Sequence, residues 1–160
     1  MVLFNKSNSL SMLRISKLSD YATALLARMA QLGTPISAPA LAADTRIPPT
    51  TVAKLLKQLA KSELVSATRG VSGGYQLNRA PRLINVAQIL TALEGPLALT
   101  ECSAHDGNCL RTGFCGTKNH WRKINRALIT ALETVTLADL ATPEYVPVFA
   151  PRPNVLATQV

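Results

Sequence analysis

A pair of prolines, Pro48 and Pro49, most constrains how this chain can fold. Proline suits the first turn of a helix and disrupts a helix interior. The sequence therefore predicts a short helix from Ser37, a break at 46–48 and a second helix over 49–62. The second helix has one apolar face, made of Val52, Leu55, Leu56 and Leu59. Its other face carries hydroxyls and ammonium groups, from Thr50, Lys54, Lys57 and Lys61. This arrangement is typical of a helix-turn-helix, although ordinary amphipathic helix pairs share it.

A hairpin is predicted directly after the second helix. Residues 64–68 and 74–77 form two strand-like runs, and the tip at 69–73 contains two glycines. A hairpin in this position corresponds to the wing of a winged helix-turn-helix. Arg69 at the tip is suited to enter a minor groove.

The charge of the chain is concentrated in its first half. Residues 1–80 hold ten Lys and Arg against three Asp and Glu, a net charge of +7. Residues 81–160 hold seven against six, a net charge of +1. This asymmetry favours a polyanionic partner for the first half, and a basic surface without a partner is the alternative.

Further helices are predicted at 16–32, 86–93, 119–135 and 136–140. The first has apolar residues at helical spacing, namely Leu18, Tyr21, Ala22, Leu25, Leu26 and Met29. The helix at 119–135 has a narrow apolar seam of Trp121, Ile124, Leu128, Ala131 and Val135. We expect a second copy of the chain to cover this seam, and packing on its own domain is the alternative. The predicted fold is therefore mainly α, a winged helix-turn-helix with a small β-hairpin wing and a long C-terminal dimerisation helix.

All three cysteines, Cys102, Cys109 and Cys115, lie in one polar segment. Thiolates select zinc, copper(I) or iron–sulfur clusters. The intervals lack the close cysteine pairs of structural zinc sites and suit a bulkier cluster. Three unrelated cysteines, a zinc-stabilised architectural DNA binder, and a thiol enzyme using His105 or His120 as a base are the alternatives. No phosphate loop, nucleophile elbow or paired carboxylate accompanies these cysteines, so we do not expect an enzyme.

The sequence also suggests how the chain is divided. We expect a disordered extension at 1–11, a DNA-binding domain at 12–97, a cluster-binding loop at 98–118, a dimerisation helix at 119–140 and a flexible tail at 141–160. No apolar run is long enough to cross a membrane, and residues 1–13 do not resemble a signal peptide. The cysteine content argues against an oxidising compartment, so we expect a cytoplasmic protein without a membrane partner.

The order of these features resembles the Rrf2 family of bacterial transcription regulators over residues 12–140. The resemblance rests on a first helix of the LRISKLSDYA type, the wing sequence RGVSGGYQL, the three clustered cysteines and the following Trp121. It is similar to the Isc- and Suf-type repressors of iron–sulfur assembly genes and to the nitric-oxide-sensing branch. It implies a homodimer that binds palindromic promoter DNA and senses cluster, iron or redox status through a [2Fe–2S] or [4Fe–4S] cluster.

The resemblance also implies roles for individual residues. Cys102, Cys109 and Cys115 would be the cluster thiolates, and DNA contacts would come from Thr50, Thr51, Lys54 and Arg69. The Isc type has a histidine ligand where this chain has Lys118, and a recognition-helix glutamate where this chain has Ala53.

The fourth cluster ligand is left open by the sequence. His105 and Asp106 lie between the first two cysteines, where simultaneous ligation is awkward. His120 lies two residues beyond the Isc-type position. Asp20 matches an aspartate that, in the nitric-oxide-sensing branch, ligates a [4Fe–4S] cluster from the opposite subunit. We favour Asp20, with His120 as the alternative.

Overall fold

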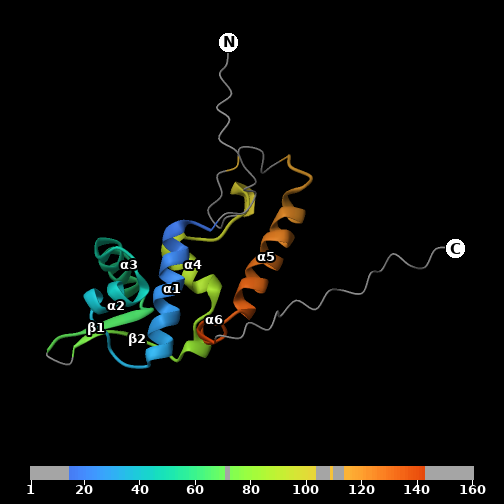
Figure 1. Ribbon diagram of the computed structural model, residues 1–160. Coiled ribbons are helices and arrows are strands. Elements are labelled where there is room, and N and C mark those ends of the chain that lie inside the picture. Colours follow the sequence, from blue (N-terminus) through green and yellow to red (C-terminus); the bar gives the residue numbers. More distant parts are fainter. Residues whose placement is uncertain (1–14, 71–72, 104–108, 110–113, 143–160) are drawn as a thin grey trace, which may run out of the picture.

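The computed structural model describes residues 15–70, 73–103, 109 and 114–142. Six α-helices, one antiparallel hairpin and two 3-10 turns follow one another along this part of the chain (Figure 1). In chain order they are α1 (Lys17–Leu32), α2 (Ala38–Thr45), α3 (Pro49–Lys61), β1 (Val65–Thr68), β2 (Gly74–Leu77), η1 (Pro81–Leu83), α4 (Val86–Glu94), η2 (Glu101–Ser103), α5 (Lys118–Thr134) and α6 (Leu137–Ala141). The mainly helical fold with a hairpin wing is as predicted, while the sequence did not predict η1 and η2.

Side-chain caps fix where several helices begin. The Ser16 side chain accepts from the amide of Ser19 at the start of α1, and Ser37 caps α2 in the same way. At α4, Asn85 and Gln88 form a reciprocal capping box. Gly33 ends α1 with a φ of 66°, a left-handed conformation that glycine adopts without strain. These local signals explain why the helix ends follow the sequence pattern closely.

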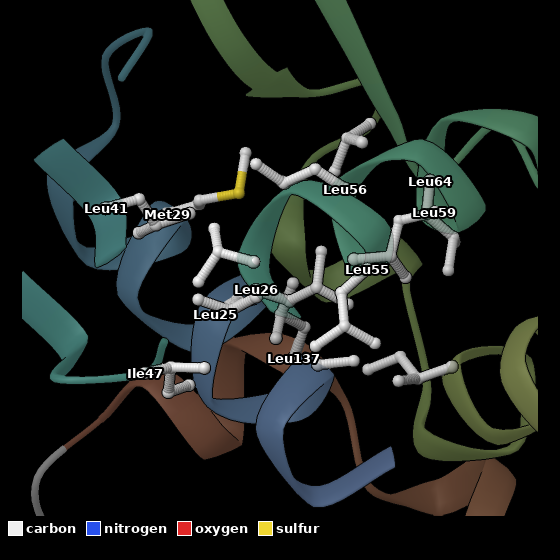
Figure 2. Close-up of a cluster of buried hydrophobic side chains, with 14 of the residues drawn as sticks. Leu25, Leu26, Met29, Leu41, Ile47, Leu55, Leu56, Leu59, Leu64 and Leu137 are labelled. Atoms are coloured by element: carbon white, nitrogen blue, oxygen red, sulfur yellow. The ribbon is translucent and has the colours of Figure 1, made fainter. Parts of the chain in front are cut away.

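One core holds α1, α2, α3, α4 and α6 together. Figure 2 shows leucines from α1, α3 and α6 meeting in it. Its largest fully buried side chains are Leu25, Leu26, Leu41, Leu55, Leu56, Leu59, Leu64, Ile84, Ile89, Leu137, Val52 and Val65. The apolar face predicted for residues 49–62 is therefore confirmed. Leu18, predicted on the inner face of the first helix, is instead 41% exposed, because the buried face of α1 begins at Ser19.

The apolar seam predicted on α5 is divided between two environments. Leu128, Ala131 and Val135 are half-buried, and Leu128 lines an apolar groove beside α4. Trp121 and Ile124, in the first half of the helix, are 40% and 49% exposed. The second half of the seam thus packs partly on its own domain, while the first half is left uncovered by the residues that the structure describes.

The chain returns to the helical core after α5. The amide of Leu137 donates to the Ile84 carbonyl oxygen at 2.7 Å, and the amide of Val86 donates to the Val135 carbonyl oxygen at 2.9 Å. Leu137 itself is fully buried in the core. These contacts anchor the C-terminal end of α5 to the domain that contains α3, a connection that the sequence did not predict.

Several expectations fall outside the described residues. These are the disordered extension at 1–11, most of the tail at 141–160, and the candidate ligands His105 and Asp106. Within the described part of the chain, no helix is long and apolar enough to cross a membrane.

The burial of Leu137 leads to a stability prediction. Leu137→Ala should lower the free energy of unfolding by about 2–5 kcal/mol, because it removes buried apolar atoms and leaves a cavity. The matched control is Leu83→Ala, at a side chain that is 58% exposed, and it should change stability by less than about 0.5 kcal/mol. Urea unfolding followed by circular dichroism measures both, and equal effects of the two substitutions would contradict this packing.

Candidate nucleic-acid interface and cysteine segment

The exposed face of α3 carries the residues expected to contact DNA. Thr50, Lys54, Lys57 and Lys61 are exposed, and Thr51 is half-buried. The four apolar residues of the opposite face are buried, which fixes the rotation of the helix about its axis. Ala53 also lies on the exposed face. The lysines therefore extend from a helix whose orientation is set by the core.

The turn between α2 and α3 sets the angle of this face. Arg46 ends α2 in the left-handed region with a φ of 56°, and Ile47 is buried beneath the turn. Pro48 and Pro49 then begin α3, and Pro48 makes no side-chain cap. The predicted break at 46–48 is confirmed, and its proline pair leaves the first turn of α3 with a preset backbone conformation.

Two glycines position the wing. A Cβ at Gly73 would lie 2.3 Å from the Thr68 carbonyl oxygen, and a Cβ at Gly74 would lie 2.7 Å from the Ile36 carbonyl carbon. Ile36 and Tyr75 exchange backbone hydrogen bonds of 3.0 and 2.8 Å, which join the hairpin to the link between α1 and α2. Arg69 follows β1 and is exposed. The wing backbone is thus pressed against the body of the domain at a point where a side chain does not fit.

The positive groups of this face are available to an external partner. Among the residues that the structure describes, the ion pair found is Arg28–Asp44, which joins α1 to α2. The hydrogen bond from Arg28 lowers the pKa of the Asp44 carboxyl. The lysines of α3 and Arg69 lie away from this pair in the chain, and the structure shows no carboxylate neutralising them in the described residues. Such a cationic surface attracts phosphate groups.

The cysteine segment lies between α4 and α5. Cys102 belongs to η2, although its side chain is outside the described part, while Cys109 and Cys115 are half-buried. The Sγ of Cys115 lies 3.3 Å from the Oγ1 of Thr117. Within the described residues, no three side chains of His, Cys, Asp or Glu come together as a metal site. The donor set of three thiols nevertheless fits an iron–sulfur cluster, because thiolates are the usual ligands of such clusters.

The two candidates for the fourth ligand are both accessible. Asp20 lies in the first turn of α1 and is exposed, and Ser16 rather than Asp20 caps that helix. His120 lies in the first turn of α5 and is also exposed. Neither belongs to a group of three or more potential metal ligands among the residues that the structure describes.

Three polar contacts that the sequence did not reveal connect this region. Gln58 of α3 donates to carbonyl oxygens at the end of α4, and Asn125 of α5 binds the backbone before η2. The Oγ of Ser19 donates to Glu94 at 2.6 Å. Hydrogen bonds from Ser16 and then Ser19 lower the pKa of the Glu94 carboxyl. The signal available in the sequence was a polar residue at helical spacing from an apolar one: Asn125 lies four residues after Trp121, and Gln58 lies three residues after Leu55.

A recognition helix held on a helical core, followed by a hairpin wing, defines the class of winged helix-turn-helix regulators. The chain belongs to the Rrf2 family: the Rrf2 model, described as an iron-dependent transcriptional regulator, matches residues 15–143. This family consists of DNA-binding transcription regulators and not of enzymes, so the thiol-enzyme alternative is not supported.

Relatives agree with this assignment. The chain is 32% identical over 130 residues to protein rrf2 of Nitratidesulfovibrio vulgaris, covering 80% of this chain and 87% of that protein. It is 33% identical over 101 residues to the transcriptional regulator IscR of Erwinia tasmaniensis, covering 63% and 61% of the two chains. It is 32% identical over 88 residues to the regulator NsrR of Bacillus licheniformis, covering 54% and 62%.

Solved structures share the fold. CymR, the global cysteine regulator of B. subtilis, superposes with a TM-score of 0.66 at 27% identity, covering 81% of this chain and 96% of that one. The IscR of T. potens superposes with a TM-score of 0.61 at 30% identity, covering 80% and 85%. The predicted family and fold class are both confirmed.

The close approach at Gly74 leads to a prediction. Gly74→Ala should destabilise the protein by about 1–3 kcal/mol, because the added methyl overlaps the backbone of Ile36 and displaces the wing. It should also weaken binding to duplex DNA. The matched control is Gly116→Ala, where no atom lies within 4 Å of the new methyl. Thermal unfolding and fluorescence anisotropy measure the two effects, and wild-type behaviour of Gly74→Ala would contradict this wing geometry.

Proposed function

We propose that this chain is a cytoplasmic, dimeric, iron–sulfur-cluster-controlled repressor that binds promoter DNA of iron–sulfur assembly genes. The observation that carries the proposal is the position of the cysteines in the chain. All three lie on the segment that leads from the helix-turn-helix into α5, and η2 within this segment packs on α5. A change at the thiols could therefore alter the orientation of α3 through this connecting segment. The names of the IscR and NsrR relatives support a sensor of this kind.

DNA is contacted in this proposal by α3 and the wing. Thr50, Thr51, Lys54, Lys57, Lys61 and Arg69 supply hydroxyl and cationic groups to phosphates and base edges. Ala53 offers only a methyl group on the same face, so it cannot accept a hydrogen bond from a cytosine amino group. The operator therefore differs from one read by a glutamate at this position.

The dimer forms in this proposal through the first half of α5. Trp121 and Ile124 are large, apolar and exposed on that helix, and a second copy of the helix would remove them from water. Twofold symmetry would then present two copies of α3 to a palindromic site.

The cluster would be held by Cys102, Cys109 and Cys115, with Asp20 of the opposite subunit as the preferred fourth ligand and His120 as the alternative. A bound cluster supplies a cross-link between thiolates that oxidants or nitric oxide can break. The three thiolates would bind the cluster, and the half-buried Leu97 and Leu99 lie just before them, near α4 and α5.

A nitric-oxide-sensing repressor is the second candidate. It is favoured by one specific observation: Asp20 is exposed in the first turn of α1 and is not used as that helix's cap. The two candidates share the DNA-binding surface and differ in signal and in target genes.

A zinc-stabilised architectural DNA binder is the third candidate function. It differs from the other two in its metal, which would be zinc instead of iron.

Metal analysis tests the cofactor directly. Protein purified without oxygen should be brown, contain iron and sulfide, and lose its visible absorption with nitric oxide or oxidants. Each of Cys102→Ala, Cys109→Ala and Cys115→Ala should abolish the colour, because each removes a thiolate ligand. Gly116→Ala, where no atom lies within 4 Å of the new methyl, controls for substitution in the same segment. Zinc in place of iron would support the architectural binder, and protein that stays colourless after iron and sulfide are supplied would contradict a cluster.

Salt dependence tests the DNA surface. Affinity should fall steeply with salt, and each of Lys54→Ala, Lys57→Ala and Lys61→Ala should lower the slope of log K against log salt by about 0.9. Lys123→Ala, an exposed lysine on α5, should leave the slope unchanged. The probe is a selected duplex, defined as the sequence that anaerobically prepared wild-type protein enriches from random DNA.

Arg69 tests whether the wing reads sequence. Arg69→Ala should weaken binding to the selected duplex more than binding to random DNA, because minor-groove width depends on sequence. Anisotropy titrations on both duplexes measure the difference. Equal wild-type affinity for both would point to the architectural binder.

The fourth ligand is tested by comparing Asp20→Ala with His120→Ala. We expect Asp20→Ala to alter the cluster spectrum and the affinity for the selected duplex, because it removes a ligand given across the dimer. His120→Ala should leave both unchanged, as should the control Asn119→Ala in the same turn of α5. The opposite result would make the preference for Asp20 wrong and assign the site to the Isc type.

A further inference from the structure

Two side-chain amides join the helix-turn-helix to the cysteine segment along one stretch of backbone, residues 91–103. The first belongs to Gln58 in the C-terminal half of α3. Its Nε2 donates to the carbonyl oxygens of Ala92 and Leu93 at 3.2 and 3.1 Å. Carbonyls in the last turn of a helix have no partner within the helix. Gln58 therefore ties the recognition helix to the open end of α4.

The end of α4 is fixed from a second direction as well. The Oγ of Ser19 on α1 donates to the Oε1 of Glu94 at 2.6 Å. Gly95 then terminates the helix with a φ of 84°, and its amide donates to the Thr91 carbonyl oxygen at 3.0 Å. Because both its side-chain and its backbone groups are engaged, the last turn of α4 is held against α1 and α3 together.

The second amide belongs to Asn125, which is 6% exposed on α5. Its Oδ1 accepts from the amide of Leu99 at 2.9 Å, and its Nδ2 donates to the Leu97 carbonyl oxygen at 3.2 Å. Losing either bond would leave a buried polar group without a partner, which is costly. Asn125 therefore holds the backbone of residues 97–99 on α5 in one arrangement.

Cys102 follows this held backbone by three residues. Thr100 and Ser103 close a tight turn around it: the Ser103 amide donates to the Thr100 carbonyl oxygen at 3.0 Å, and the Thr100 amide donates to the Ser103 Oγ at 3.0 Å. A displacement of the Cys102 backbone must therefore move Leu99 or break these bonds. Leu99 is bound to α5 through Asn125, and only residues 94–96 separate Leu97 from Leu93.

We infer that Gln58 and Asn125 are positioning residues that transmit the state of the cysteine segment to the recognition helix. This inference rests on the proposed cluster-controlled function. Asn125 makes η2 and α5 move together, and Gln58 makes the end of α4 and α3 move together. The quantity that these residues would control is an affinity ratio: affinity for the selected duplex in cluster-loaded protein divided by that in cluster-free protein. In coupled sites one ligand typically changes the affinity for another by about 5- to 150-fold.

Isosteric substitutions separate this role from packing. Gln58→Glu keeps the shape of the side chain and removes its donor, and Asn125→Leu removes both hydrogen bonds. Asn125→Asp is the milder variant, since it still accepts from Leu99 and loses the donor to Leu97. The matched control is Gln31→Glu, because Gln31 donates to the Ala141 carbonyl oxygen at 3.0 Å and joins α1 to α6 outside the 91–103 stretch.

Two readouts test the inference. In cluster-free protein, hydrogen exchange at residues 97–103 should rise in Asn125→Leu, in Asn125→Asp and also in Gln58→Glu, although the hydrogen bonds of Gln58 end at Leu93. In all three variants the affinity ratio should fall to about one while iron and sulfide content stays at the wild-type level. Gln31→Glu should keep the wild-type exchange and the wild-type ratio.

The outcomes distinguish the inference from the function on which it rests. Suppose that the wild-type ratio of cluster-loaded to cluster-free affinity is above about fivefold. If Gln58→Glu and Asn125→Asp both keep that ratio, the positioning role is wrong and the proposed function stands. Unchanged exchange at 97–103 in Gln58→Glu would also overturn the positioning role. A wild-type ratio of about one would overturn the proposed function and the inference together.

Discussion

The hydrogen bonds from Gln58 to the last carbonyls of α4 are the contact on which the arrangement of this protein depends. They join α3, the helix proposed to contact DNA, to the end of α4, from which the chain continues toward the cysteine segment. A second attachment is hydrophobic: Leu137, at the start of α6, is fully buried in the core. Helix α5 is therefore attached to the domain at two points, by Asn125 near its middle and by Leu137 just beyond its C-terminal end. Figure 1 shows the result: α3 and the hairpin lie on one side of α1, and α5 lies on the other.

The helix-turn-helix and the wing could be predicted because their signals are local. Pro49 begins a helix, Leu55 and Leu59 set its buried face, and Gly73 and Gly74 mark a hairpin. The contacts between elements could not be predicted in the same way. A glutamine within a helix is normally read as solvent-facing, and nothing local to Gln58 indicates that its partners are 34 and 35 residues away. The burial of Leu137 likewise depends on a return of the chain that no sequence period encodes.

The sequence predicted which residue types make up the candidate site, but only part of their arrangement in space. The structure confirms that Lys54, Lys57 and Arg69 are exposed on the helix-turn-helix and wing, while the arrangement of the three thiols remains a proposal. Fold similarity does not settle the signal, because a global cysteine regulator and an IscR superpose on this chain to similar degrees. The cysteine segment and its connection to α4 therefore carry the functional argument, and the shape of the domain does not.

Hydrogen exchange on wild-type protein, compared with and without its cluster, tests the connection between these two regions most directly. The account predicts that loading changes protection at residues 97–103, through the last turn of α4 at 91–95, and into the C-terminal half of α3 around Gln58. A change confined to residues 102–118, with 91–95 and α3 unaffected, would contradict the account.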